Sequence, residues 1–98
     1  MSNDLEKIKA VIRNHAKDLK QNYHVKNIGI FGSFARGDSH KNSDVDILVE
    51  LSQPVSFFDF VDIEDYFKKI LKRKVDVVTK NALKQAIKDD ILAETVYV

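Results

Sequence analysis

The chain has 98 residues, of which 44% are hydrophobic and 32% charged, and its 16 basic and 15 acidic side chains leave a net charge of +1. This composition excludes a disordered chain, and the balanced charge provides no overall positive field to attract a nucleic acid. The chain contains no cysteine, which excludes disulfides and thiolate zinc sites. We expect one soluble cytoplasmic domain, residues 1–98, because no apolar run could span a membrane and no signal peptide is evident.

The N-terminal segment has the spacing of an amphipathic helix. Charged side chains alternate with apolar residues that recur every three or four positions, namely Leu5, Ile8, Ile12, Ala16 and Leu19. Ser2 or Asn3 is suited to cap its N-terminus. The pattern predicts one helix of about four turns.

A strand and a tight turn follow this helix. Residues 25–31 are rich in β-favouring side chains and end at Gly32, which predicts a strand that leads into a turn. Gly29 lies inside the strand, where a missing side chain often marks the close approach of a ligand or of another backbone segment. Residues 34–36 are able to begin a helical turn, and the polar residues 38–43 predict a loop.

The rest of the chain alternates strands and helices. Residues 44–51 and 75–79 predict two further strands. Between them, Ser56 is suited to cap a helix whose apolar stripe consists of Phe57, Phe60, Ile63, Phe67 and Ile70. A last helix is predicted over residues 82–92, with four inward side chains: Leu83, Ala86, Ile87 and Ile91. This alternation predicts a small α/β or α+β domain.

Two apolar segments allow alternatives. Phe58 and Val61 lie outside the stripe of their helix, so they either reach the core by another route or form a contact surface. Residues 95–98 predict a short edge strand or the tail of the last helix.

Three aspartates are predicted to gather on one face of the sheet. Asp44 and Asp46 alternate with Val45 and so point the same way, with α-carbons about 6.5 Å apart. Asp76 alternates with Val75 and Val77 in the next strand, and it joins the other two acids if the strands pair. Such carboxylates repel one another, and hard oxygen ligands favour Mg²⁺. Two ions of this kind can stabilise an in-line phosphoryl transfer. The alternative is that all three aspartates are ordinary surface acids.

The turn after the first strand is suited to an anion. Gly32 permits close approach, and its neighbouring amides together with the Ser33 hydroxyl can donate hydrogen bonds to a phosphate. Arg36 either adds positive charge for that phosphate or simply pairs with Asp38. The turn is not a Walker loop, because Asp38 stands where that loop requires lysine.

The joint pattern resembles a known family. It consists of the turn Gly32-Ser33-Phe34-Ala35-Arg36-Gly37 followed by Ser43-Asp44-Val45-Asp46-Ile47-Leu48-Val49, with Asp76 on a later strand. This pattern resembles the nucleotidyltransferase superfamily that includes DNA polymerase beta, and within it the minimal nucleotidyltransferase (MNT) branch. The resemblance covers most of the chain and implies the nucleotidyltransferase fold, a small mixed sheet of three to four strands flanked by helices.

The resemblance also implies a site and an activity. Gly32 and Ser33 would bind the triphosphate of ATP, with Arg36 beside them. Asp44, Asp46 and Asp76 would be the catalytic carboxylates and would bind Mg²⁺, two ions being expected. The expected reaction is transfer of AMP from ATP to a hydroxyl.

The expected acceptor is a partner protein, because the chain is short for a domain that also binds a substrate. The resemblance implies an antitoxin that adenylylates a tyrosine of a HEPN-domain toxin, with which it would form a hetero-oligomer. One alternative is a non-catalytic antitoxin that masks its toxin sterically. Another is a nucleotidyltransferase acting on a small molecule or, less in keeping with the balanced charge, on a nucleic-acid end.

Overall fold

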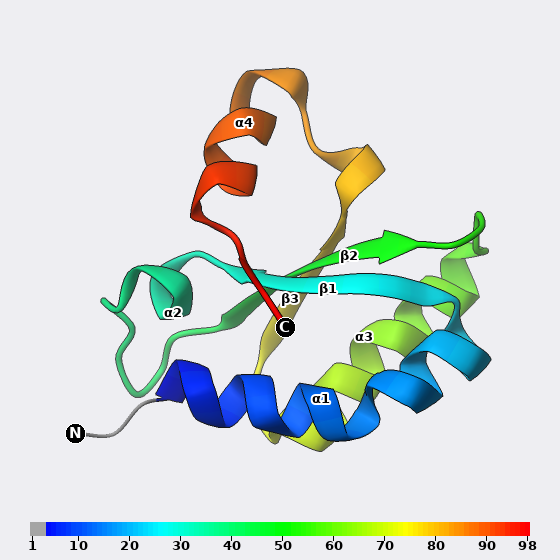
Figure 1. Cartoon of the computed structure of the whole chain (residues 1–98), viewed down its shortest axis with the longest axis horizontal. Helices are drawn as coiled ribbons and strands as arrows, with labels where there is room; N and C mark the ends of the chain where they lie inside the picture. The colour runs from blue at the N-terminus through cyan, green and yellow to red at the C-terminus, as the bar shows by residue number, and fades with distance from the viewer. Residues whose placement is uncertain (1–3) are drawn as a thin grey trace.

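The structure is a computed structural model that describes residues 4–98 (Figure 1). The elements in chain order are α1 (Asp4–Tyr23), β1 (Val25–Phe31), α2 (Ser33–Arg36), β2 (Val45–Leu51), α3 (Phe57–Leu71), β3 (Val75–Thr79), the 3-10 turn η1 (Lys80–Ala82), α4 (Gln85–Glu94) and β4 (Val96–Tyr97). The helix predicted at the N-terminus is longer than expected, with 20 residues. The predicted cap at Ser2 or Asn3 lies outside the described residues.

The strands form one mixed sheet in the order β3-β2-β1-β4. β1 pairs antiparallel with β2 and with β4, whereas β2 and β3 run parallel. Helices α1 and α3 lie together along one side of the sheet, and α4 stands on the other side (Figure 1). The predicted fold, a small mixed sheet flanked by helices, is confirmed.

One hydrophobic core fills the space between the sheet and the helices α1 and α3. It arises because alternate residues of each strand share a face and every third or fourth residue of each helix does so. Its fully or almost fully buried members include Ile12, Leu19, Ile30, Val45, Ile47, Val49, Ile63, Phe67 and Val77. The residues between the buried valines and isoleucines of β2 and β3 therefore face the opposite side.

Helix α3 begins as predicted, but its first turn projects out of the core. The Ser56 hydroxyl accepts a hydrogen bond from the Asp59 amide at 3.1 Å, which caps the helix. Phe57, predicted to face the core, is 74% exposed, and Phe58 is 78% exposed. Side chains in a first helical turn tilt toward the N-terminus, so these two rings extend beyond the packed part of α3. Val61 is half-buried.

The last helix is placed differently from the prediction. Residues 80–82 form the 3-10 turn, and α4 starts only at Gln85. None of its residues is buried, and Ile87, predicted to face inward, is 48% exposed. Ala86 is also exposed, whereas Leu83 and Ile91 are half-buried. The reason is that the side of the sheet that carries α4 has no further layer to cover the helix.

Of the two alternatives for the C-terminal residues, the structure shows the edge strand, β4, and it explains the glycine inside β1. β4 pairs with Gly29 and Ile30. A β-carbon on Gly29 would collide with the methyl group of Thr95 and touch the ring of Tyr97. The segment that approaches Gly29 is therefore the end of this same chain. None of the helices within residues 4–98 has the length and apolar character needed to cross a membrane.

Candidate active site

The turn after β1 depends on two glycines with left-handed backbone angles. Gly32 has a φ of 72° and Gly37 a φ of 82°, and the four residues of α2 lie between them. The Arg36 amide donates to the Gly32 carbonyl at 3.0 Å, and the Gly37 amide donates to the Ser33 carbonyl at 3.0 Å. These bonds close a compact turn whose start is buried at Gly32 and whose end is exposed.

A buried side chain anchors this turn to the core. Phe34 lies in the middle of α2 and is only 3% exposed. The Arg73 guanidinium, two residues before β3, lies 4.9 Å from the centre of the Phe34 ring and makes a cation–π contact with it. The turn is thereby held against the ends of the strands that carry the predicted aspartates.

The turn and the second strand meet directly. A β-carbon on Gly32 would collide with the carboxylate of Asp46, whose Oδ2 atom is the nearest heavy atom. Gly32 is thus required both for its φ and for the space that Asp46 occupies. The glycine turn and the aspartate motif, which are separate in the sequence, are therefore in direct contact in space.

The structure brings the predicted aspartates to the same end of β2 and β3. Asp46 and Asp76 are register partners on these parallel strands, which places them side by side at a strand spacing of about 4.8 Å. Asp44 lies one residue before β2, where the Val45 amide donates to the Lys74 carbonyl at 3.0 Å. Asp46 is half-buried, whereas Asp44 and Asp76 are exposed.

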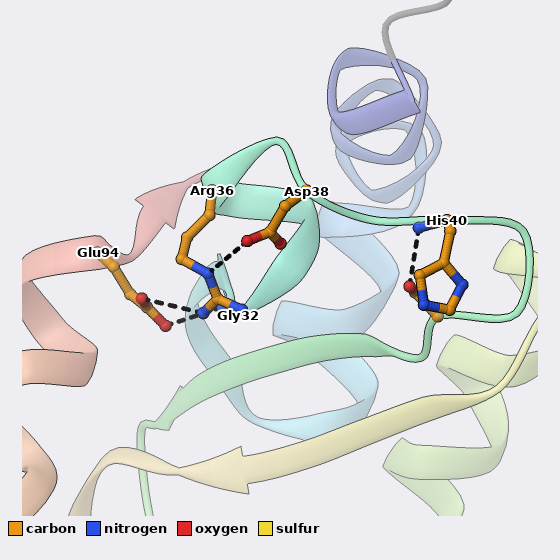
Figure 2. A network of polar contacts seen from close by, with 6 residues as sticks. Gly32, Arg36, Asp38, His40 and Glu94 are labelled. Carbon is orange, nitrogen blue, oxygen red and sulfur yellow. Dashed lines mark hydrogen bonds and ion pairs between the residues drawn. The ribbon is translucent and has the colours of Figure 1, made fainter.

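The loop before Asp44 is also ordered by hydrogen bonds. The His40 amide donates to the Ser43 hydroxyl at 2.9 Å (Figure 2). In return, the Ser43 amide donates to the His40 carbonyl at 2.9 Å. This pair closes the polar loop predicted over residues 38–43 and sets the direction in which the chain enters β2.

The electrostatics of the site are unfavourable for an unneutralised Asp46. Burial raises the pKa of the Asp46 carboxyl above its usual value, and the charges of Asp76 and Asp44 raise it further. Arg36 acts in the opposite direction. The carboxylates therefore repel one another, and a cation would relieve that repulsion.

The donor set is suited to Mg²⁺, which prefers carboxylate oxygens together with phosphate oxygens and water. Within residues 4–98, no three His, Cys, Asp or Glu side chains already form a group able to hold a metal ion. Asp46 and its register partner Asp76, with Asp44 two residues before Asp46, supply carboxylate oxygens, and phosphate oxygens would complete the coordination shell.

Arg36 has two acidic partners, one predicted and one not. Its Nε atom donates to Asp38 at 3.2 Å and its Nη1 atom to Glu94 at 3.3 Å (Figure 2). The pairing of Arg36 with Asp38 that the sequence suggested is present. The hydrogen bond to Asp38 is the main cause that raises the pKa of the Arg36 guanidinium.

Sequence reasoning missed Glu94. Its Oε1 atom accepts the hydrogen bond of the Gly32 amide at 2.9 Å, across 62 positions of sequence. Glu94 is the last residue of α4 and directly precedes the residues that lead into β4. Nothing in the motif around Gly32 indicates this contact, and only its position next to the predicted edge strand was visible in the sequence.

Comparison with known proteins agrees with this geometry. Residues 12–98 match the family model described as a nucleotidyltransferase domain. A protein of Methanocaldococcus jannaschii, whose name marks it as a candidate protein adenylyltransferase, is 48% identical over 79 residues, which are 81% of this chain and 92% of that protein. The protein adenylyltransferase MntA of Thermococcus cleftensis is 40% identical over 94 residues, with 96% of this chain and 95% of that protein covered.

Solved structures share the fold at lower identity. A structure described as a minimal nucleotidyltransferase superposes with a TM-score of 0.74 at 23% identity and covers 98% of this chain and 95% of that one. A second match is a chain from the complex of a tri-AMPylated HEPN toxin of Shewanella oneidensis with MNT antitoxin. It superposes with a TM-score of 0.61 at 16% identity, and the alignment covers 95% of this chain and 66% of that chain. The family match over residues 12–98 and the close relatives together establish that the chain belongs to the nucleotidyltransferase domain family.

Proposed function

We propose that this protein transfers AMP from ATP, with Mg²⁺, to a hydroxyl group of a partner protein, and that the partner is a HEPN-domain toxin modified on tyrosine. The observation that carries the proposal is the contact between the Gly32 turn and Asp46, which stands beside Asp76. Hydrogen-bond donors of the Gly32 turn, which suit a phosphate, thus lie next to carboxylates, which suit a metal ion. A triphosphate bound with Mg²⁺ requires both kinds of group close together.

The turn would hold the phosphates. Gly32 offers a backbone amide, Ser33 a hydroxyl, and the Arg36 guanidinium a positive charge. Guanidinium groups bind phosphate oxygens through short, charge-assisted hydrogen bonds. Because the Phe34 anchor fixes the turn, these donors would keep the triphosphate in one orientation.

The Mg²⁺ ions would be held by three carboxylates, those of Asp44, Asp46 and Asp76. When bound, Mg²⁺ neutralises phosphate charge and favours expulsion of pyrophosphate. The acceptor oxygen attacks the α-phosphorus, so that a new P–O bond forms, the bond to the bridging oxygen breaks, and pyrophosphate leaves. Asp76, which is exposed and is the register partner of Asp46, would accept the proton of the acceptor hydroxyl. Positioning and electrostatics would supply most of the rate.

Two findings on related proteins support the choice of acceptor. Relatives that are 40–48% identical over most of their lengths are named as protein adenylyltransferases. A protein of the same fold was solved in complex with a HEPN toxin that carries three AMP groups. We place the reaction in the cytoplasm, where ATP and Mg²⁺ are plentiful.

The test is transfer of label to the partner. The purified protein is incubated with Mg²⁺, ATP labelled on its α-phosphate and a HEPN-domain protein from the same organism. We expect label on a toxin tyrosine, and a loss of about a hundredfold or more in rate for Asp44→Asn. Glu50→Gln, which changes an acid farther along β2, is the matched control and should retain the wild-type rate.

The same variants decide between catalysis and steric masking. If the protein neutralises its toxin by modification, the double variant Asp44→Asn with Asp46→Asn fails to neutralise it although it still binds. Full neutralisation by this double variant would contradict the proposed activity and would indicate masking. Label on a small molecule in the absence of any protein partner would contradict the proposed acceptor.

A further inference from the structure

A carboxylate of the chain itself occupies the anion-binding groups of the Gly32 turn. The Glu94 side chain accepts the Gly32 amide with one oxygen at 2.9 Å and contacts the Arg36 guanidinium with the other at 3.3 Å (Figure 2). Both donors are groups that the proposed function assigns to the triphosphate. Neither family motif accounts for this acid.

We propose that Glu94 is an internal competitor of the nucleotide, a carboxylate that occupies the Gly32 amide and Arg36 until a triphosphate displaces it. The proposal rests on the proposed function in one respect, namely that phosphate binds at this turn. It adds a residue that sets nucleotide affinity from outside the motif.

The Glu94 carboxylate and a phosphate group cannot occupy the Gly32 amide at the same time. Gly32 has a single amide hydrogen, and Glu94 already accepts it at a normal hydrogen-bond distance. A phosphate oxygen in the same place would also lie beside the Glu94 carboxylate and near Asp46, so like charges would repel at short range. Glu94 must therefore leave before a phosphate can use this donor.

The surrounding structure allows Glu94 to leave without unfolding. Its side chain is 31% exposed and reaches the turn from the end of α4, a helix with no buried residue. The backbone just after it is held by β4, which pairs with β1 at Gly29 and Ile30. A rotation of the Glu94 side chain is sufficient for release, because β4 holds the backbone that directly follows Glu94 and need not move.

Arg36 would stay in place after the release. Its Nε atom is bound to Asp38 at 3.2 Å, independently of Glu94. The guanidinium would then present its freed Nη1 group to the incoming phosphate. Because only the released form binds, the apparent dissociation constant equals the intrinsic one divided by the fraction of molecules in which Glu94 has released the turn.

The test compares wild-type protein with Glu94→Gln, which keeps the size of the side chain and removes its charge. Calorimetric titration with Mg²⁺ and α,β-methylene ATP, and separately with inorganic tripolyphosphate, reports affinity without catalysis. We expect Glu94→Gln to bind both ligands about tenfold more tightly, the effect of losing one charge-assisted contact. The control Glu50→Gln also removes one carboxylate from the chain, but its acid bonds Asn27 and Lys80, so it should bind like the wild type.

A second readout follows the contact itself. The Gly32 amide resonance should shift in Glu94→Gln, and in the wild type it should shift when tripolyphosphate is added, because both changes replace the same hydrogen bond. Equal or weaker ligand binding by Glu94→Gln, at unchanged melting temperature, would overturn the competition while leaving the nucleotide site intact. Binding by neither protein would overturn the nucleotide site and the competition together.

Discussion

On the side of the sheet that packs against α1 and α3, the strands β2 and β3 present buried valines and isoleucines. On the other side the same two strands present Asp46, Asp76 and Glu50 together with the apolar residues Leu48, which is buried, and Val78, which is half-buried. Both sides are formed by the same strands, β2 with seven residues and β3 with five. Neighbouring residues of a strand face opposite sides, so a residue of the core and a residue of the candidate site can be adjacent in the sequence.

The contrast extends to the helices. Helices α1 and α3 contribute fully buried side chains such as Ile12 and Phe67, whereas α4 contributes none. The covered side therefore supplies most of the stability, and the open side holds carboxylates that repel one another in the free protein. Four substitutions test this division, in order of decreasing expected effect.

The largest effect is expected from Phe67→Ala on the covered side. Phe67 is 0% exposed, and removing a fully buried ring should lower the free energy of unfolding by about 3–5 kcal/mol. The control is Phe58→Ala on the same helix, where the ring is 78% exposed and the change should stay within about 0.5 kcal/mol. Urea denaturation measures both, and similar losses would contradict the assignment of the core to this side.

Gly32→Ala should disrupt the contact between the glycine turn and Asp46 on the open side of the sheet. The substitution places a β-carbon at a φ of 72° and against the Asp46 carboxylate, so we expect a loss of about 1–3 kcal/mol and of nucleotide binding. Gly37→Ala separates the two causes, because Gly37 has a φ of 82° but no heavy atom within 4 Å of the added carbon. Equal losses in melting experiments and in nucleotide titrations would show that the contact with Asp46 is unimportant.

Asp46→Asn should stabilise the free protein while it abolishes activity. Removing a half-buried charge that Asp76 and Asp44 repel should raise the free energy of unfolding by about 1 kcal/mol, measured in the presence of EDTA. Glu50→Gln should act in the opposite direction, since the hydrogen bond from Asn27 lowers the pKa of Glu50 and so favours its charged form. A lower free energy of unfolding for Asp46→Asn would show that repulsion between these carboxylates does not destabilise the free protein.

The smallest effect is expected at the margin of the covered side, where α1 and α3 meet. The Tyr66 hydroxyl donates to Asp18 at 2.7 Å, and burial together with this bond raises the pKa of Tyr66 from 10.0 to about 12. Because the pKa is higher in the folded state, the stabilisation is complete below pH 10 and is lost as the pH rises through about 12.

Ultraviolet absorbance during alkaline titration measures this directly. Wild-type protein should show one tyrosine that ionises at about pH 12, and Tyr66→Phe should lose that step. Tyr97→Phe, which changes a tyrosine that is 51% exposed, should keep it. A late step that persists in Tyr66→Phe would contradict the assignment.

Much of the fold was predictable because its signals are local. Residues 25–31 and 75–79 form strands with the predicted bounds, since their β-favouring side chains are flanked by turn-forming or charged residues. The cap at Ser56 was visible for the same reason. The aspartates were predicted to share a face because strand alternation follows from sequence alone, once their two strands are adjacent.

Burial at the ends of elements was less predictable. Phe57 continues the apolar stripe of α3, and Ile87 belongs to the apolar stripe of α4. Phe57 is nevertheless 74% exposed and Ile87 48% exposed. A stripe shows which face of a helix could be covered, but whether anything covers it depends on where neighbouring elements end. Sequence periodicity contains no information on that point.

The sequence by itself determined the strands β1 and β3, the start of α3 and the glycine turn, because each depends on residues close together in the chain. It also identified Asp44, Asp46 and Asp76 as candidate site residues. Only the tertiary structure placed Glu94 on the Gly32 amide, across 62 positions. That contact exists because β4 pairs with β1 at Gly29, where the absent side chain leaves room for Thr95 and Tyr97. Long-range contacts of this kind depend on how strands dock, and docking is decided by packing of the whole chain.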